Sequence, residues 1–310
     1  MAIMNEKINN VLNKISKVLR DDQIIIDAEM KFYTTFKAGG KASILVMPES
    51  TKEIIEIKAI CSEENLECFL MGNGSNLLVS DKGFNGLIMK LGSGFEKCYV
   101  DGNVLYAQSG ALLSKVTKIA ATAGLSGLEF ASGIPGSVGG AIYMNAGAYD
   151  GEIRDTIISA RCIDKNGKII SLDKDEMEFS YRKSIFWHKE YVIIEGSFQL
   201  EPDNEEDILQ RMREFNKRRN EKQPINLPSA GSTFKRPDGY YAGKLIEDAG
   251  LKGLINGGAS VSKLHAGFIV NDNNATADEI IDLIEIVKAK VHEKSGVTLE
   301  SEIKILGGTE

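Results

Sequence analysis

Two glycine-rich segments contain the residue types that could hold a phosphate-bearing ligand. The first, Gly72–Asn76, lies between two short apolar stretches that predict strands. Glycines let backbone amides converge on a phosphate without an intervening Cβ, and Ser75 and Asn76 add side-chain donors. Leu77 stands where the dinucleotide-binding Rossmann motif has its third glycine, and a strand is predicted to follow, so that motif is excluded. On its own, this segment is equally consistent with a tight turn.

The second segment, Gly133–Gly140, is more specific because it holds four glycines together with a proline and a serine. A hairpin turn needs only one or two glycines, so the others indicate backbone that lies against a ligand. Asn145, Gly147 and Tyr149 extend the small and polar character of this region. The economical hypothesis is a cofactor with a diphosphate held between the two segments; a purely structural turn is the alternative.

Basic residues cluster later in the chain, although the net charge is −7. Arg211 and Arg213 are predicted to lie on a solvated helix face. Lys222 is predicted to lie just outside that helix, and Lys235 and Arg236 follow across a loop. These last three are candidates for binding a second anionic ligand, such as the diphosphate of a nucleotide sugar.

Three further polar residues do not stand out from their surroundings. Arg182 could be a surface arginine, and Ser232 could be a turn serine. Glu302 falls on the face of the last predicted strand that would normally be wet. The residues alone favour a structural or exposed role for each of them.

The elements that must position these residues have readable boundaries. Capping boxes predict that two amphipathic helices begin at Ser50 and Thr276. An acidic first turn and basic last turns predict another helix that begins near Glu205. The remaining predicted features are a helix over 112–123 that ends before Gly124, a hairpin turn at 164–167, strands at 68–71 and 77–79, a domain boundary near 201–204, and a last strand with Val297, Leu299, Ile303 and Ile305 on one face.

The composition limits the class of protein. The 310 residues are enough for about two domains. The acidic charge argues against general nucleic-acid binding, which needs a broad basic surface. No apolar run approaches the ~20 residues that span a bilayer, and the amino terminus reads as an amphipathic helix rather than a signal peptide. We therefore expect a cytoplasmic protein.

The cysteines and histidines show no metal-binding spacing. No two cysteines form a CxxC pair, which predicts reduced thiols and no structural metal. The residues concerned are Cys61, Cys68, Cys98, Cys162, His188, His265 and His292.

Six motifs together resemble the UDP-N-acetylenolpyruvoylglucosamine reductases, enzymes of bacterial peptidoglycan precursor synthesis. The resemblance runs from about Phe32 to Leu306. The motifs are TTFKAGG from Thr34, GNGSNLLVSD from Gly72, ASGIPGSVGGAIYMNAGAY from Ala131, SYRKS from Ser180, PSAGSTFKRP from Pro228 and LESEIKILG from Leu299.

The resemblance implies an α+β fold. It combines an FAD-binding fold of the vanillyl-alcohol-oxidase/PCMH type, built from two α+β subdomains, with a smaller α+β substrate-binding domain. The expected divisions are residues 1–90 for the first subdomain, 91–203 for the second and 204–298 for the substrate domain, with a carboxy-terminal strand at about 299–310 that returns to the first subdomain.

The resemblance also implies the ligands and their sites. FAD is expected as a non-covalent cofactor, since no histidine lies in or near either glycine segment to attach it. NADPH is expected as the hydride donor and UDP-N-acetylglucosamine enolpyruvate as the substrate of a monomeric enzyme. By analogy, Arg182, Ser232 and Glu302 are catalytic. The implied substrate-binding residues are Tyr181, Lys222, Lys235 and Arg236. The implied FAD-binding residues are Gly72, Asn73, Gly74, Ser75, Asn76, Gly133, Ile134, Pro135, Gly136, Ser137, Gly139, Gly140 and Gly147.

The implied chemistry gives each catalytic residue a role. Hydride reaches the terminal carbon of an enol ether conjugated to a carboxylate, so negative charge develops on that carboxylate. Arg182 can stabilise the charge, and Glu302 helps if it is neutral or paired. Ser232 is placed by analogy to deliver a proton to the carbon beside the carboxylate.

Two other functions remain open. One is a different FAD-dependent oxidoreductase or oxidase on the same fold, and the other is a non-enzymatic nucleotide-sugar sensor. The chain also resembles the shorter members of the family, which lack an inserted loop with a tyrosine that closes over the substrate. Tyr240, Tyr241 and Gly253–Gly258 are candidates to cover the substrate instead.

Overall fold

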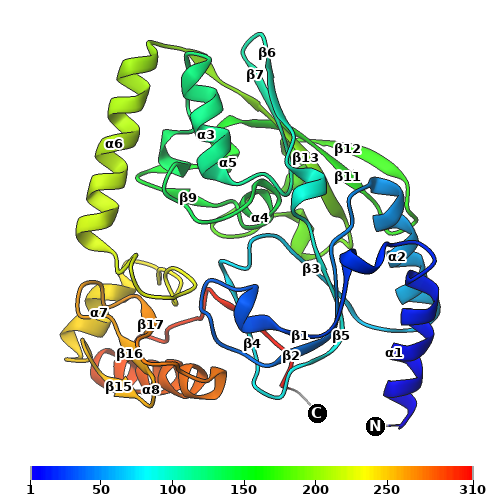
Figure 1. Ribbon diagram of the computed structural model, residues 1–310. Coiled ribbons are helices and arrows are strands. Elements are labelled where there is room, and N and C mark those ends of the chain that lie inside the picture. Colours follow the sequence, from blue (N-terminus) through cyan, green and yellow to red (C-terminus); the bar gives the residue numbers. More distant parts are fainter. Residues whose placement is uncertain (1, 309–310) are drawn as a thin grey trace. The chain divides into compact units, whose positions relative to one another are not determined.

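The computed structural model describes residues 2–308, which contain both helices and strands (Figure 1). These residues divide into two compact units. The first unit comprises residues 2–25, 44–73 and 86–218, and the second comprises 26–43, 74–85 and 219–308. The helices are α1 (Ala2–Ile15), α2 (Thr51–Glu63), α3 (Leu113–Thr122), α4 (Val138–Met144), α5 (Ile153–Thr156), α6 (Glu205–Lys222), α7 (Ala242–Asp248) and α8 (Ala277–Ser295). None of the helices described combines the length and the apolar character needed to span a membrane.

A four-stranded sheet occupies the amino-terminal part of the chain. Its strand order is β1 (Ile24–Glu29), β2 (Lys41–Val46), β5 (Phe84–Lys90) and β3 (Cys68–Met71). β3 runs parallel to β5, with Cys68 opposite Leu87. The stripe of α2 formed by Ile54, Ile57 and Cys61 is buried in the core of the first unit, as its spacing predicts.

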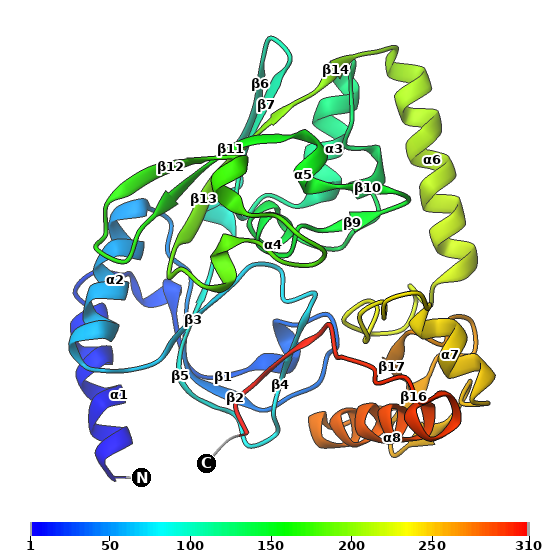
Figure 2. The ribbon, with the colours of Figure 1, turned by 180° about the vertical axis from the view of Figure 1, so that it is seen from behind.

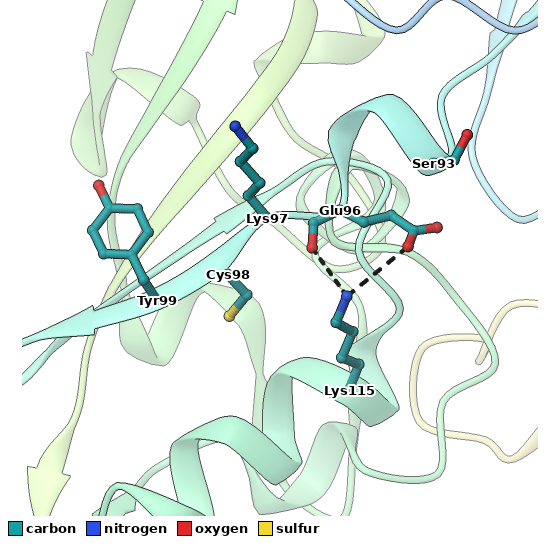
Figure 3. Close-up of a pocket in the computed structure, with 6 residues that line it drawn as sticks. All are labelled: Ser93, Glu96, Lys97, Cys98, Tyr99 and Lys115. Atoms are coloured by element: carbon teal, nitrogen blue, oxygen red, sulfur yellow. Dashed lines mark hydrogen bonds and ion pairs between the residues drawn. The ribbon is translucent and has the colours of Figure 1, made fainter.

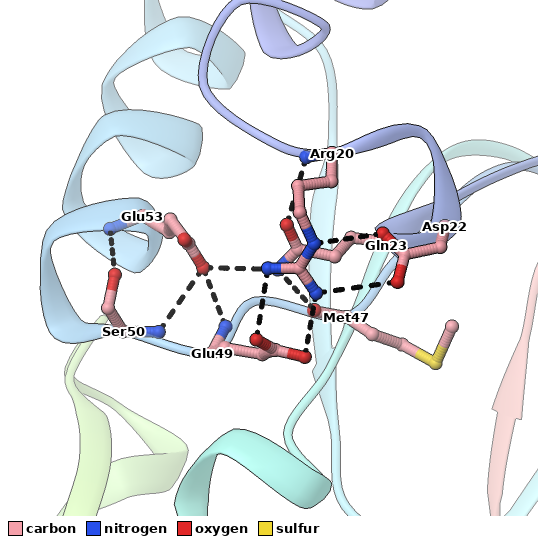
Figure 4. A network of polar contacts seen from close by, with 7 residues as sticks. All are labelled: Arg20, Asp22, Gln23, Met47, Glu49, Ser50 and Glu53. Carbon is pink, nitrogen blue, oxygen red and sulfur yellow. Dashed lines mark hydrogen bonds and ion pairs between the residues drawn. The ribbon is translucent and has the colours of Figure 1, made fainter.

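A polar network fixes the start of α2 (Figure 4). The Ser50 hydroxyl accepts the Glu53 N–H at 3.3 Å, and the Glu53 carboxylate accepts the Ser50 N–H at 3.2 Å, which confirms the predicted capping box. Glu53 also accepts a hydrogen bond from Gln23 at 3.3 Å, and Arg20 pairs with Glu49 at 3.0 Å. The network therefore joins the segment before β1 to the beginning of α2.

A five-stranded antiparallel sheet forms the centre of the first unit. Its strand order is β12 (Ile169–Asp173), β11 (Ile157–Ile163), β13 (Val192–Gln199), β7 (Val104–Gln108) and β6 (Cys98–Asp101). The predicted turn at 164–167 joins β11 to β12, and Gly167 there has a φ of 81°. Side chains of α3 and α4 share the core on one face of this sheet, so the helices position the second glycine segment beside it. The first unit also has two small antiparallel pairs, β8 (Leu125–Ser126) with β14 (Glu201–Pro202) and β9 (Gly147–Ala148) with β10 (Gly151–Glu152).

The second unit packs α7 and α8 with a three-stranded antiparallel sheet. Its strands are β15 (Ile255–Asn256), β16 (Ala259–Val261) and β17 (Ile269–Asn271). α8 begins with the predicted capping box of Thr276 and Glu279 and ends at Gly296, whose φ is 72°. Its predicted stripe of Ile280, Ile284, Val287 and Val291 is fully buried. In the same unit, β18 (Lys304–Leu306) pairs in parallel with β4 (Leu77–Val79).

The last strand differs from its prediction. Residues 297–303 are not a strand, and Ile305 is 37% exposed while Leu299 and Ile303 are buried, so the predicted single apolar face is wrong. The physical reason is a change of backbone partner. Residues 300–302 bond with 233–235, through an isolated bridge between Phe234 and Ser301, before the chain reaches β4.

Two predicted loop positions are helical. The segment after Ser137 forms α4, because Val138, Ala141 and Ile142 supply a buried stripe at helical spacing. Lys222 is the last residue of α6 rather than a residue outside it. The helical pattern extends to Gln223, whose N–H donates to the Arg219 carbonyl at 2.8 Å, and ends at a proline that cannot donate.

Arg211 does not lie on a simply solvated face, contrary to its prediction. It pairs with Glu129 at 2.8 Å and with Asp203 at 2.5 Å. Glu129 is only 7% exposed and also accepts hydrogen bonds from Ser126 and from the Gly127 N–H. Burial opposes ionisation of Glu129, but these donors outweigh it and hold the pKa of the carboxyl below its usual value.

We expect the Glu129→Gln substitution to lower the free energy of unfolding at neutral pH by about 2 kcal/mol, because it removes the charge from a hydrogen-bonded buried carboxylate. This contribution is complete above the unfolded-state pKa and is lost as the pH falls through the lower folded-state pKa. Urea unfolding of both proteins at neutral and acidic pH measures the effect. Equal stability at neutral pH would contradict it. The Arg213→Gln variant is the control, since Arg213 pairs with Glu206 at the exposed surface.

Candidate functional site

The beginning of the first glycine segment contacts the middle of the second within the first unit. The Asn73 amide donates to the Pro135 carbonyl at 2.7 Å. A Cβ on Gly72 would lie 2.1 Å from the Ser137 hydroxyl oxygen, so a side chain at position 72 would displace this hydroxyl. The structure therefore brings Gly72 and Asn73 together with the segment that contains Pro135 and Ser137.

The second glycine segment is held against the end of β7. The Gly139 N–H donates to the Ser109 carbonyl at 2.8 Å, and the Leu113 N–H donates to the Gly136 carbonyl at 3.0 Å. A Cβ on Gly139 would lie 2.8 Å from the Ser109 Cβ. The glycine at position 139 thus serves close packing of the protein on itself, in addition to any approach of a ligand.

Buried hydroxyls in this region fit a phosphate-bearing ligand. Within residues 2–308, the Ser109 and Ser137 hydroxyls are buried and have no hydrogen-bond partner. Such groups cost free energy unless something accepts their protons, and a diphosphate supplies acceptor oxygens. The glycines beside Ser109 and Ser137 leave backbone amides uncovered by side chains. The two serines and the glycines therefore fit the diphosphate of FAD.

Ser109 was not among the residues predicted from the sequence. The signal available was weak: it begins a Ser-Gly-Ala stretch directly after the alternating strand at 104–108. Only the packing of β7 against α4 shows that this stretch borders the second glycine segment.

The remainder of the first glycine segment belongs to the second unit. Gly74 has a φ of 65°, and its carbonyl accepts the Thr35 N–H at 3.2 Å. The Asn76 amide donates to the Glu302 carbonyl at 3.2 Å, and the Lys304 N–H donates to the Asn76 carbonyl at 3.0 Å. The predicted cofactor residue Asn76 therefore fixes the backbone of the predicted catalytic residue Glu302.

Ser232 and Glu302 come from two neighbouring segments of the second unit. Glu302 donates its N–H to the Thr233 carbonyl at 2.8 Å. Thr233 is fully buried, and its hydroxyl accepts the Ile269 N–H at 3.0 Å. Ser232 itself is exposed, and Glu302 is half-buried. The accessible Ser232 hydroxyl is therefore adjacent in the chain to Thr233, whose backbone bonds with Glu302.

Arg182 belongs to the first unit and lies in a tight turn. Its φ is 57°, its guanidinium donates to the Gly147 carbonyl at 3.2 Å, and it stacks over the Tyr181 ring at 5.0 Å. The structure therefore brings together three residues predicted for different roles, namely Tyr181, Arg182 and Gly147.

The predicted substrate cations have different surroundings within the second unit. Lys235 pairs with Glu300 at 2.8 Å, and the Arg236 guanidinium lies 4.0 Å from the centre of the Tyr241 ring. Lys222 is exposed at the end of α6. Tyr240 and Tyr241 are 49% and 63% exposed, so both rings are accessible to a ligand.

The first unit also has a surface pocket that is lined by none of the predicted site residues (Figure 3). Its lining comprises Ser93, Glu96, Lys97, Cys98, Tyr99 and Lys115. Lys115 donates to the Glu96 carbonyl at 3.3 Å, and burial raises the pKa of the Cys98 thiol to about 11. The thiol is therefore protonated and unreactive at neutral pH.

His265 holds the backbone of Gly267, which in turn bonds with Thr233, the residue after Ser232. Its Nδ1 accepts the Gly267 N–H at 3.1 Å, and the Gly267 carbonyl accepts the Thr233 N–H at 2.9 Å. Burial lowers the pKa of His265 below its ordinary 6.5. The imidazole is therefore neutral in the folded protein near neutral pH.

We expect the free energy of unfolding to fall as the pH drops below about 6.5, because only the unfolded chain then protonates this histidine. The His265→Asn variant keeps an acceptor for the Gly267 N–H but has no imidazole to protonate. It should therefore lose the histidine's contribution to the change in unfolding free energy with pH, which is at most about 1.4 kcal/mol per pH unit. Urea unfolding of both proteins between about pH 5 and about pH 7.5 tests the difference. Identical slopes would contradict it.

The fold and the cradle around Ser109 and Ser137 define the class as a flavoprotein with an FAD-binding domain. Residues 42–173 match the FAD binding domain family, and residues 223–306 match the family described as UDP-N-acetylenolpyruvoylglucosamine reductase, C-terminal domain.

Whole-chain relatives identify the family. The chain is 48% identical over 297 residues to the UDP-N-acetylenolpyruvoylglucosamine reductase of Caldanaerobacter subterraneus subsp. tengcongensis, with 96% of this chain and 98% of the relative covered. It is 49% identical to the enzyme of the same name from Clostridium novyi, with 96% and 97% covered. The crystal structure of the Thermus caldophilus enzyme aligns with a TM-score of 0.78 at 35% identity, over 92% of this chain and 98% of that one. The chain belongs to the family of UDP-N-acetylenolpyruvoylglucosamine reductases, and the predicted α+β FAD-binding fold is confirmed.

Proposed function

We propose that this chain reduces UDP-N-acetylglucosamine enolpyruvate to UDP-N-acetylmuramate in peptidoglycan precursor synthesis, with NADPH as reductant. The observation that carries the proposal is family membership over almost the whole chain, together with a cradle that fits a diphosphate. Hydrogen bonds of Arg182 to Gly147 and of Glu302 to Thr233 support the proposed roles of Arg182 and Glu302.

FAD is the cofactor of this proposal. When bound, it supplies the redox chemistry that passes hydride from NADPH to the enolpyruvoyl double bond. Gly72, Asn73 and Ser137, which lie together in the first unit, are proposed to hold its diphosphate. Gly74 and Asn76 are also proposed to bind FAD. The remaining proposed FAD residues are Ser75, Gly133, Ile134, Pro135, Gly136, Gly139, Gly140 and Gly147.

The proposed catalytic roles follow from the charge that develops on the substrate carboxylate. Arg182 places its permanent positive charge beside that carboxylate. Glu302, in a neutral or paired form, also stabilises the developing negative charge. Ser232 donates a proton to the carbon beside the carboxylate. The exposure of Ser232, on a segment anchored by Thr233, supports this assignment.

Further parts of the proposal concern substrate binding and organisation. Tyr181, Lys222, Lys235 and Arg236 are proposed to contact the nucleotide-sugar substrate, and their cationic members suit its diphosphate. We also propose a monomeric cytoplasmic enzyme with domains at 1–90, 91–203 and 204–298 and a last strand that belongs with the first domain. Analytical ultracentrifugation tests the monomer.

The proposed reaction has a direct test. NADPH oxidation by the purified protein should require UDP-N-acetylglucosamine enolpyruvate and should yield UDP-N-acetylmuramate in equal amount. UDP-N-acetylglucosamine, which lacks the enolpyruvoyl group, is the control and should support no oxidation. Oxidation that requires oxygen instead of the enolpyruvoyl sugar would identify an oxidase and overturn the proposal.

A further inference from the structure

The turn that carries Arg182 is held in an unfavourable conformation. A φ of 57° is rare for a residue with a side chain, and the left-handed conformation costs about 1 kcal/mol or more. Ser180 and Lys183 exchange backbone hydrogen bonds across the turn at 3.1 and 3.2 Å. Such a conformation persists only where neighbouring groups determine it, so the contacts around the turn bear on where the guanidinium lies.

Asn145 provides contacts of this kind within the same unit. It is fully buried and ends α4 with a φ of 43°. Its amide nitrogen donates to the Ser180 carbonyl at 3.1 Å and to Glu152 at 2.6 Å, and its amide oxygen accepts the Arg154 N–H at 3.0 Å. One side chain thereby joins the end of α4, the start of α5 and the Arg182 turn. Figure 2 shows α4 and α5 in the same part of the first unit.

A second contact ties the other side of the turn to the same helix. The Ser184 hydroxyl donates to the Tyr143 carbonyl at 2.7 Å. Since α4 begins inside the second glycine segment, it is a rigid spacer between that segment and the Arg182 turn. The guanidinium reaches back to Gly147, which follows Asn145 by two residues.

We propose that Asn145 is a positioning residue, which sets where the Arg182 guanidinium lies relative to the second glycine segment. The inference rests on the catalytic role proposed for Arg182. Asn145 acts through the Ser180 carbonyl, because its side chain is fully buried and its amide bonds to protein groups. Its effect is therefore confined to the step that uses Arg182, which is the transfer from the reduced cofactor to the substrate.

Asn271 offers a matched control, because its side chain also donates two hydrogen bonds and accepts one from a backbone N–H. It is 7% exposed, its amide nitrogen donates to the Phe36 and Lys37 carbonyls at 3.1 and 3.2 Å, and its oxygen accepts the Ala275 N–H at 2.7 Å. All these partners belong to the second unit. The Asn271→Gly variant therefore measures how far the loss of any buried, hydrogen-bonded amide slows the reaction.

The test is a double-substitution cycle on the FAD-loaded protein. Asn145→Gly removes the amide while glycine tolerates the left-handed backbone. We expect reduction of the flavin by NADPH to stay within about two-fold, and reoxidation by the enolpyruvoyl substrate to slow about ten-fold through misplacement of the guanidinium. In an Arg182→Ala background, Asn145→Gly should cause no further slowing, whereas Asn271→Gly should have the same effect in both backgrounds. Asn145→Asp, which keeps the side-chain shape but loses both donors, tests the same step if the glycine variant is too unstable.

A second measurement does not depend on activity. Hydrogen exchange of the backbone amides in residues 180–183 should accelerate in Asn145→Gly and remain unchanged in Asn271→Gly. Additive slowing of reoxidation by Asn145→Gly and Arg182→Ala, or unchanged exchange at 180–183, would overturn the inference alone. Normal reoxidation in Arg182→Ala would overturn the proposed role of Arg182 and this inference together.

Discussion

The Ser232→Ala variant is expected to accept electrons from NADPH at the normal rate but to be reoxidised by UDP-N-acetylglucosamine enolpyruvate about 10³-fold more slowly. The two half-reactions separate because proton donation is needed only when the substrate is reduced. The substitution should not disturb the fold, since Ser232 is exposed and the adjacent Thr233 carries the buried hydrogen bonds. Rapid mixing, with each half-reaction followed by flavin absorbance, measures both rates.

A conservative variant provides the control for Ser232. Ser232→Cys keeps a dissociable proton at the same position and should recover part of the lost rate, with a pH dependence that reflects the thiol. Equal slowing of both half-reactions in Ser232→Ala would contradict the proposed role. That result would mean that the hydroxyl serves cofactor binding or local structure.

The Gly139→Ala variant is expected to bind FAD about 30-fold more weakly, which corresponds to about 2 kcal/mol. The new Cβ would lie 2.8 Å from the Ser109 Cβ and 3.2 Å from its carbonyl oxygen, so α4 must move away from β7. That movement breaks the hydrogen bond from the Gly139 N–H and shifts the buried hydroxyls of Ser109 and Ser137. Fluorescence titration of the apoprotein with FAD measures the loss.

Gly140→Ala separates crowding by the protein from crowding by the cofactor. Apart from the neighbouring backbone of α4, the described atom nearest to a Cβ there is the Ser137 hydroxyl oxygen at 3.7 Å, which is ordinary contact. Weaker FAD binding in this variant therefore reports the ligand itself beside residue 140. Unchanged FAD affinity in Gly139→Ala would contradict the cradle formed by β7 and α4.

Local signals in the sequence predicted individual elements well. The capping boxes at Ser50 and Thr276 placed the starts of α2 and α8, because the residues that satisfy the helix end are local in sequence. Glycine at position 124 likewise marked the end of α3, with its φ of 66°. These features need no tertiary partner.

Features that depend on distant partners were not predictable in the same way. Ile305 breaks the alternation of the last strand because residues 300–302 bond with the segment after Ser232. Arg211 is held by Glu129, which lies 82 residues earlier. Neither contact leaves a pattern in the local sequence.

The candidate site shows the same division. The glycine segments were visible as segments, but the contact of Asn73 with Pro135 and the role of Ser109 required the fold. Arg182, Ser232 and Glu302 were not separable from ordinary surface residues by type or spacing. The family resemblance selected them, and the structure adds how each backbone is anchored.

The most direct test of the account follows the colour of the purified protein in the absence of oxygen. The protein is expected to carry FAD and to be yellow, NADPH should bleach the flavin absorbance, and UDP-N-acetylglucosamine enolpyruvate should restore it with one UDP-N-acetylmuramate formed per flavin. A protein that binds no FAD, or whose bleached flavin is restored by oxygen but not by the enolpyruvoyl sugar, would contradict the account.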